Sequence, residues 1–256
     1  MAGSDMMVGN PRPTRPRVIV AADPAALATT AAERIVARII ANAGRVAICL
    51  SGGSSPKQLF ELLATDAYRN RIPWDRVHWF FGDERFVPVT DSRSNTAMAR
   101  KAFLDACAPP ANVHPIEVDS GSPEEAARRY ERELKSFYGA DTLNPARPLF
   151  DVVLLGVGPD GHTASLFPGY PAVNEITRWV IEVPEAHVEP FVPRISLTLP
   201  ALTSCREMLF EASGAGKRAI LTRVLDGEDL PANRARSQVE TIWLMDKAAV
   251  PENFRE

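Results

Sequence analysis

The chain has little cysteine and no strong excess of charge of either sign. Its three cysteines, Cys49, Cys107 and Cys205, are odd in number and far apart. This argues against a disulfide framework and against a cysteine-based zinc site, and it favours a reducing compartment. The net charge is only −3 and no basic run occurs. We therefore expect neither nucleic acid nor a membrane surface as a partner.

Long apolar segments are missing as well. No run approaches the roughly 20 residues that a membrane span needs. The chain also does not begin with the charged and apolar regions of a secretory signal, so we expect a cytoplasmic protein. Residues 1–16 carry Gly, Ser, Asn and three prolines, and we expect them to form a disordered N-terminal tail.

Short apolar runs and helical patterns alternate along the rest of the chain. The runs at 17–21, 46–50, 77–81, 113–116, 152–155, 179–183, 194–199, 207–212 and 241–245 predict strands, and the patterns at 24–43, 57–63, 94–104, 123–138 and 218–225 predict helices. Such alternation is typical of an α/β protein. We expect residues 17–256 to form a single α/β domain with a mostly parallel, Rossmann-like open central sheet flanked by helices.

A glycine-rich loop follows the apolar run at 152–155. It holds Gly156, Gly158 and Gly161, and Asp160 and His162 lie within it. Glycine lets a ligand approach the backbone closely. In open α/β sheets, ligands bind at the carboxyl ends of the strands. Of the four histidines in the chain, only this one combines such a loop with a preceding buried strand and a neighbouring carboxylate. We interpret it as functional rather than structural.

Other loops at the same predicted edge carry polar groups. Ser51-Gly52-Gly53-Ser54-Ser55-Pro56 joins a strand to a helix. Its backbone N–H groups, hydroxyls and helix end suit an anion, although a tight turn with a serine cap would look the same. Gly82-Asp83-Glu84-Arg85 follows the run at 77–81, where solvated loop residues are the ordinary alternative. Lys217 begins a helix after a glycine-rich turn and suits a single phosphate, or else is an ordinary solvated lysine.

Two nucleotide motifs are matched only in part. The three glycines at 156–161 fit the dinucleotide fingerprint, but they lie in mid-chain and no acidic residue ends the next expected strand, so we do not predict NAD. Gly216-Lys217 lacks the remaining P-loop residues, because Glu211 and Arg218 stand where Gly and Ser or Thr are required. No His, Cys and carboxylate set has metal-ligand spacing. We expect no metal and no cofactor.

Four segments together resemble a known family. Ser51-Gly-Gly-Ser-Ser-Pro, Gly82-Asp-Glu-Arg-Phe-Val-Pro, Gly156-Val-Gly-Pro-Asp-Gly-His-Thr-Ala-Ser-Leu-Phe-Pro-Gly and Arg194-Ile-Ser-Leu-Thr-Leu-Pro are similar to the 6-phosphogluconolactonases of the glucosamine-6-phosphate isomerase/deaminase group. The resemblance covers almost the whole chain from about residue 17. It implies hydrolysis of 6-phospho-D-glucono-1,5-lactone to 6-phosphogluconate in the oxidative pentose phosphate pathway, without metal or cofactor.

The resemblance also implies roles for residues. His162 would be the general base that activates water, Asp160 or Asp83 would support it, and Arg85 or loop N–H groups would stabilise the oxyanion. The phosphate of the small-molecule substrate would be held by Gly52, Gly53, Ser54, Ser55 and Lys217, with Arg194 as a further candidate. We expect a monomer or a weak homo-oligomer.

Two alternative functions fit these motifs less well than the lactonase does. The amino-sugar-6-phosphate isomerase/deaminase branch carries a loop that resembles Gly-His-Ile-Ala-Phe-Asn-Glu-Pro-Gly, and Phe167 occupies the position of its proton-shuttling Glu. Arg85 also stands where that branch tends to carry Tyr. A non-catalytic sugar-phosphate-binding regulator would be expected to carry a DNA-binding segment, and the chain has no basic stretch for one.

Overall fold

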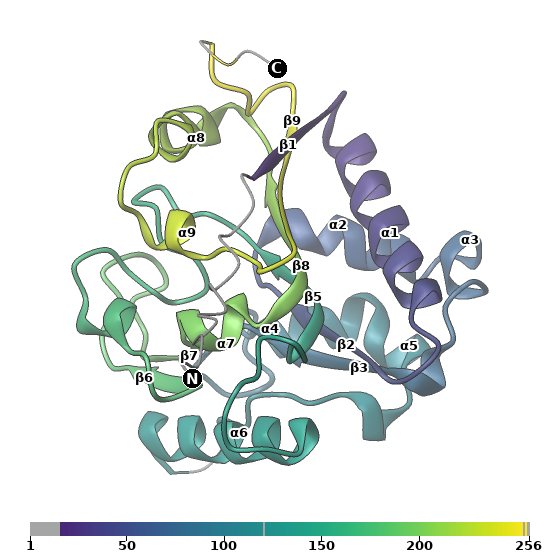
Figure 1. The fold of residues 1–256 in the computed structure, drawn as a ribbon, viewed down its shortest axis with the longest axis vertical. Coiled ribbons are helices and arrows are strands. Elements are labelled where there is room, and N and C mark those ends of the chain that lie inside the picture. Colours follow the sequence, from purple (N-terminus) through teal and green to yellow (C-terminus); the bar gives the residue numbers. More distant parts are fainter. Residues whose placement is uncertain (1–15, 120, 253, 255–256) are drawn as a thin grey trace, which may run out of the picture.

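The computed structural model describes residues 16–119, 121–252 and 254. Its centre is a six-stranded sheet in the order β1-β9-β8-β5-β2-β3 (Figure 1). Every neighbouring pair in this sheet is parallel, which confirms the mostly parallel α/β sheet predicted from the sequence. The strands are β1 (Arg17–Ala21), β2 (Val46–Leu50), β3 (Val77–Phe81), β5 (Phe150–Leu155), β8 (Cys205–Ala212) and β9 (Glu240–Asp246).

Helices cover both faces of this sheet. Figure 1 shows α1 (Pro24–Ala41) and α2 (Ser54–Leu63) on one side, and α8 (Arg218–Leu225) and α9 (Pro231–Arg234) on the other. The expected helix starts are confirmed at α1, where the Asp23 carboxylate accepts the N–H of Ala26 at 2.8 Å, and at α6 (Pro123–Tyr138), where Ser122 and Glu125 form a capping box. One buried apolar core extends from Ala21 to Ala249.

A second, three-stranded sheet is antiparallel, in the order β4-β7-β6. It consists of β4 (Asp83–Arg85), β6 (Val180–Val183) and β7 (Arg194–Leu197), and α6 packs against β6 and β7. Gly82 joins the two sheets: its N–H donates to the carbonyl of Leu50 in β2, and its carbonyl accepts the N–H of Leu197. The expected loop at 83–85 is therefore a short strand, and it is held beside β2.

Two sequence expectations are wrong in detail. Residues 113–116 do not form a strand, since only Val113 makes a bridge, to Trp79. Pro115 has no N–H, so a ladder cannot continue through it. The helix expected at 94–104 begins as α4 (Asn95–Ala99), widens to a π-helix, η2 (Arg100–Leu104), and ends as α5 (Asp105–Cys107).

The remaining elements are short. They are α3 (Asp66–Arg69), η1 (Trp74–Arg76), η3 (Pro110–Asn112), η4 (Pro171–Asn174), α7 (Leu199–Thr203) and η5 (Ala215–Lys217). Among the described residues, no helix has both the length and the apolar character that crossing a membrane requires. The tail expected at 1–16 lies outside the described residues, except for Pro16.

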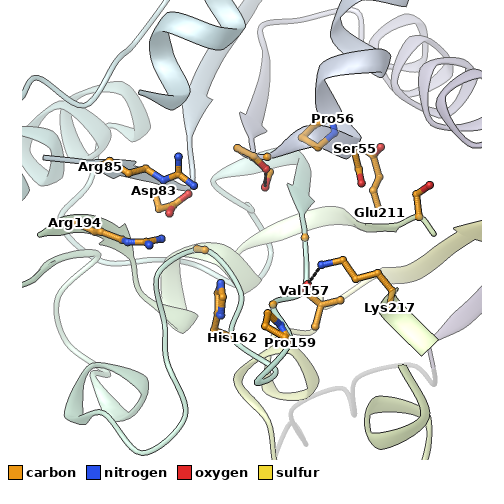
Figure 2. A pocket seen from close by; sticks show the side chains of 17 residues that line it. Ser55, Pro56, Asp83, Arg85, Val157, Pro159, His162, Arg194, Glu211 and Lys217 are labelled. Atoms are coloured by element: carbon orange, nitrogen blue, oxygen red, sulfur yellow. Dashed lines mark hydrogen bonds between the residues drawn. The ribbon is translucent and has the colours of Figure 1, made fainter. Parts of the chain in front are cut away.

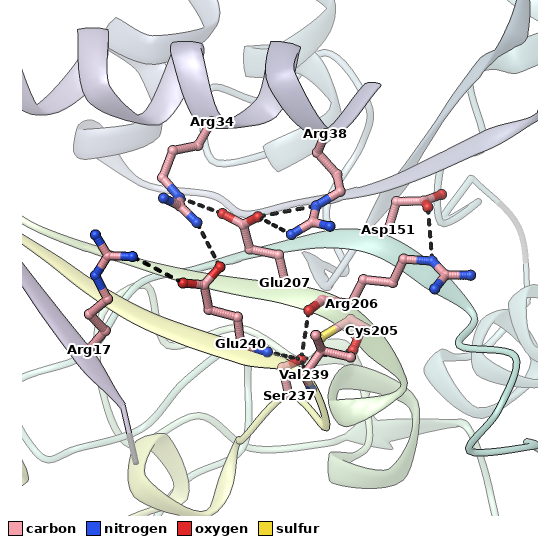
Figure 3. Close-up of polar contacts among 10 residues, drawn as sticks. All are labelled: Arg17, Arg34, Arg38, Asp151, Cys205, Arg206, Glu207, Ser237, Val239 and Glu240. Carbon is pink, nitrogen blue, oxygen red and sulfur yellow. Dashed lines mark hydrogen bonds and ion pairs between the residues drawn. The ribbon is translucent and has the colours of Figure 1, made fainter. Parts of the chain in front are cut away.

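Glu207 links α1 to the sheet near the N-terminal end of β8. Its side chain is 3 % exposed, and its carboxylate lies 2.6 Å from Nε of Arg34 and 2.8 Å from Nη2 of Arg38 (Figure 3). Arg34 also contacts Glu240 of β9 at 2.8 Å. A buried carboxylate is tolerated only when charge partners and hydrogen bonds replace its water, and here both arginines come from the covering helix.

The strand order creates a switch point between β2 and β5. From β2 the chain moves outward to β3 at one edge, whereas from β5 it proceeds through β8 to β9 in the other direction. The loops that follow β2 and β5 therefore diverge and leave a crevice at the carboxyl edge of the sheet. Ligands bind at such a point in open α/β sheets.

Candidate active site

A pocket lies at this switch point, and most of the residues predicted from the sequence line it (Figure 2). Its lining comes from the loops after β2, β5 and β8, from the start of α2, from β4 and β7, and from the end of β8 and η5. The lining residues are Ser51, Gly52, Gly53, Ser55, Pro56, Asp83, Arg85, Gly156, Val157, Gly158, Pro159, His162, Ala164, Arg194, Glu211, Ser213 and Lys217. Asp160 lies beside the pocket, in contact with His162. Ser54 begins α2, but its side chain lies outside the described part of the structure.

His162 is held by Asp160 through one ring nitrogen. Its Nδ1 lies 2.5 Å from Oδ1 of Asp160, which also accepts the backbone N–H of His162 at 3.1 Å. With Nδ1 engaged, Nε2 is the nitrogen that remains for a ligand. Figure 2 shows the ring pointing into the pocket, toward Asp83 and Arg194.

A second imidazole shares the same carboxylate. Nε2 of His187, in the segment between β6 and β7, lies 2.9 Å from Oδ2 of Asp160. Burial alone would raise the pKa of Asp160, but hydrogen bonds from both histidines and the charge of His162 outweigh it and hold this pKa well below its usual range. Asp160 therefore stays an acceptor for both rings throughout the neutral range.

Glycine is required at position 158, where the loop folds back under the His162 ring. A Cβ on Gly158 would lie 2.0 Å from Cε1 of His162, far inside van der Waals contact. The N–H of Gly158 donates to the carbonyl of His162 at 2.9 Å and closes the loop. At Gly156, in contrast, a Cβ would meet nothing within 4 Å. Of these two glycines, only Gly158 is needed to make room for the His162 ring.

The three charged residues of β4 do not all point to the same face of the strand. Side chains in a strand point alternately to opposite faces, so Asp83 and Arg85 line the pocket while Glu84 points away. Glu84 is fully buried and accepts the N–H groups of Asn95 and Thr96, both at 2.8 Å, at the start of α4. Glu84 therefore caps the start of α4 and does not line the pocket.

Asp83 is buried and has defined partners. Its Oδ2 accepts the hydroxyl of Ser165 at 2.6 Å, and its Oδ1 accepts Nδ2 of Asn95 at 3.1 Å. Arg85 donates from Nη1 to the carbonyl of Arg93 at 2.6 Å, and its Nε has no partner among the described atoms.

Arg194 faces Arg85 across the second sheet, since the two are register partners in the β4–β7 pair. It is 2 % exposed, and its guanidinium lies 5.4 Å from the ring centre of Phe167. Its Nη2 donates to the carbonyl of Pro190 at 3.0 Å, and its Nε lacks a partner among the described atoms. Burial lowers the pKa of Arg194, although Asp83 opposes that shift. Two cationic groups therefore converge beside the imidazole.

The start of α2 forms another part of the wall. Gly53 precedes the helix with φ +105°, a conformation that favours glycine. Gly52 is required for close packing, because a Cβ there would lie 1.9 Å from Oδ1 of Asn95. Ser55 and Pro56 of the first turn line the pocket, so the positive end of this helix faces it.

Lys217 reaches the same region from η5. Its Nζ donates to the carbonyl of Val157 at 2.6 Å, and burial lowers its pKa. In Figure 2, Lys217, Ser55 and Glu211 lie on one side of the pocket, and Arg85, Asp83 and Arg194 lie on the other. The pocket thus has two cationic ends with the imidazole between them.

Sequence reasoning missed two residues of the site. Nothing near His187 in the sequence signals that its ring reaches Asp160. Glu211 was noted only as a mismatch to the P-loop, yet it lines the pocket. Among the described residues, no three or more His, Cys, Asp or Glu side chains are grouped so that they could hold a metal ion.

Comparison with known proteins agrees with this geometry. The model of the family described as glucosamine-6-phosphate isomerases/6-phosphogluconolactonase matches residues 22–243. The chain belongs to this family. It is 40 % identical to the 6-phosphogluconolactonase of Synechocystis over 225 residues, which cover 86 % of this chain and 89 % of that protein. It is 38 % identical to that of Streptomyces coelicolor, covering 93 % and 94 %.

A solved structure is also similar. The 6-phosphogluconolactonase of Trypanosoma brucei superposes with a TM-score of 0.80 at 30 % identity, covering 92 % of this chain and 97 % of that one. The parallel sheet with flanking helices is therefore the fold of this family's structures.

Proposed function

We propose that this chain hydrolyses 6-phospho-D-glucono-1,5-lactone to 6-phosphogluconate, a step of the oxidative pentose phosphate pathway. The observation that carries the proposal is the His162–Asp160 pair, which lies between the two cationic ends of the pocket (Figure 2). We assign the end with Arg85 and Arg194 to the sugar and call it the sugar end. The end with Ser55 and Lys217 is assigned to the phosphate. The curated relatives of similar length that bear the name 6-phosphogluconolactonase support the same activity.

His162 is the general base. Its Nε2 takes a proton from a water molecule as the water oxygen attacks the lactone carbonyl carbon, and Asp160 stabilises the imidazolium that forms. The tetrahedral intermediate then breaks its bond to the ring oxygen. That oxygen takes the proton back from His162, so the imidazole ends the cycle neutral, and one water has been added across the ester.

The oxyanion is stabilised at the end of the pocket where two guanidinium groups converge. Arg85 suits the role of an oxyanion-hole donor, because it lines the pocket and its Nε has no hydrogen-bond partner among the described atoms. We assign Arg194 to this sugar end as well, and not to the phosphate, because Figure 2 shows it beside Asp83 and Arg85. Asp83 is suited to accept a hydrogen bond from a sugar hydroxyl.

The phosphate binds at the opposite end. The N–H groups and the positive end of α2 at Gly53, Ser54 and Ser55, together with the ammonium of Lys217, provide a seat for a dianion. Gly52 shapes this loop by letting Asn95 approach. Binding energy from the remote phosphate positions the lactone for attack.

The amino-sugar isomerase reaction is less well supported. Phe167 is fully buried and its ring centre lies 4.8 Å from that of His162, so it packs against the imidazole, and an apolar ring cannot transfer a proton. We further propose that the protein acts in the cytoplasm as a monomer or a weak homo-oligomer, on a small sugar phosphate and not on nucleic acid.

The test is an assay on freshly prepared 6-phosphogluconolactone, with glucosamine 6-phosphate as the contrasting substrate and with spontaneous lactone hydrolysis subtracted. We expect rapid turnover of the lactone only. Turnover of the amino sugar would favour the isomerase branch, and binding of sugar phosphate without any turnover would favour a regulator.

A further inference from the structure

Two glutamates of β8 point to the same face of the sheet. Glu207 and Glu211 are four residues apart in one strand, and alternation places both on the face that α1 and α2 cover. Both residues are buried: as whole residues, Glu207 is 2 % exposed and Glu211 is 3 % exposed. Glu207 has two arginine partners, which replace the water it has lost (Figure 3). Glu211 lies nearer the carboxyl end of the strand, beside the pocket.

Neither carboxylate oxygen of Glu211 has a hydrogen-bond partner among the described atoms. Its side chain lines the active-site pocket, and Figure 2 shows it directed toward Ser55 in the first turn of α2. Burial raises the pKa of Glu211 to about 8. At neutral pH this group is therefore largely a protonated carboxylic acid, which has one O–H to donate.

Charged groups on the surrounding elements are engaged elsewhere. Lys217 donates to the carbonyl of Val157. Asp246, at the end of β9, accepts the hydroxyl of Ser213 and the N–H of Gly214. Asp83, Arg85, Arg194 and His162 belong to the sugar end of the pocket described above (Figure 2). A buried polar group that the protein leaves unsatisfied costs free energy, so its partner is expected to be the occupant of the pocket.

We propose that Glu211 is a substrate-binding residue that donates a hydrogen bond from its protonated carboxyl group to the phosphate of the bound sugar. This inference rests on the proposed function, because it requires the phosphate to lie at the Ser55 and Lys217 end. A sugar phosphate is largely a dianion above pH 7, since its second pKa is about 6. It offers only acceptors, which match the donor that a protonated carboxyl group provides.

The proposal gives affinity a definite dependence on pH. When Glu211 loses its proton, the donor becomes a buried anion beside a dianion, and both desolvation and repulsion then oppose binding. Only the protonated form binds, so the apparent Kd is divided by the protonated fraction. With the pKa near 8, that fraction falls about tenfold between pH 7 and pH 9, and binding weakens accordingly.

The experiment measures the Kd of 6-phosphogluconate by calorimetry at pH 7 and pH 9. This ligand does not hydrolyse, and its charge is nearly constant over that range. We compare the wild type with Glu211→Gln, whose amide remains a donor at both pH values. Deprotonation of Lys217 affects both proteins alike. The ratio of Kd at pH 9 to Kd at pH 7 should be about tenfold larger in the wild type than in Glu211→Gln.

Glu207→Gln is the matched control, because it makes the same change on the same face of β8, outside the pocket. It should keep the wild-type ratio. A second readout is proton uptake, from calorimetry in buffers of different ionisation enthalpy: at pH 8 the wild type should take up about half a proton more than Glu211→Gln on binding.

Equal ratios in the wild type and Glu211→Gln would overturn the proposal. So would a Glu211→Gln variant that binds more than tenfold more weakly at pH 7, since that would show that the carboxylate charge is needed. These outcomes differ from failure of the proposed function, in which lactone turnover is absent from the wild type whatever the pH dependence of binding.

Discussion

Replacement of the two histidines that share Asp160 should have very different effects. His162 and His187 contact opposite oxygens of one carboxylate, at 2.5 and 2.9 Å, so each variant removes one imidazole and leaves the same acceptor. Only His162 lines the pocket. We expect His162→Ala to lower kcat by about 10²–10⁴, the usual contribution of a general base, which corresponds to roughly 2.7–5.5 kcal/mol.

His187→Ala should cost much less. The His187 side chain is 39 % exposed. Even a charged contact that is open to water contributes at most about 1 kcal/mol, which is about fivefold in rate if all of it is lost in the transition state. The assay is initial-rate hydrolysis of fresh lactone, with the spontaneous rate subtracted and folding checked by thermal unfolding. His162→Ala with more than a tenth of wild-type kcat, or equal losses in both variants, would refute the assignment of the base.

Three further perturbations test other parts of the site and the fold. Gly158→Ala should lower kcat by roughly 100-fold by displacing the His162 ring, whereas Gly156→Ala should be near wild type; similar losses in both would contradict the role assigned to Gly158. Lys217→Ala should raise KM more than it lowers kcat, and the reverse would point to a role in the chemistry. Glu207→Ala should lower the free energy of unfolding by about 3 kcal/mol, measured in denaturant, because two arginines lose their partner. Glu33→Ala is the control, because it removes an ion pair with Arg71 in which the Glu33 side chain is 50 % exposed. Its loss of unfolding free energy should be much smaller.

The parallel sheet and the loops of the site could be predicted because their signals are local. A buried parallel strand is an apolar run, and the glycines after β2 and β5 mark chain reversals at one edge. The same local reasoning failed at 83–85, where three charged residues in a row resemble a loop. They form a strand because Gly82 connects β2 to the second sheet, and this pairing with β7 involves residues more than a hundred positions away.

His187 and Glu211 were missed for a related reason. His187 lies 27 positions from Asp160 in an irregular segment, and only the fold brings them together. Glu211 lies in a strand with Glu207, and from the sequence both resemble polar positions of a half-buried strand. The difference between them is that α1 presents arginines to one and not to the other. A strand pattern can indicate which face a side chain occupies, but the partners on that face belong to another element. A buried carboxylate without a partner can therefore be recognised only in the folded chain, where the pocket beside it also becomes visible.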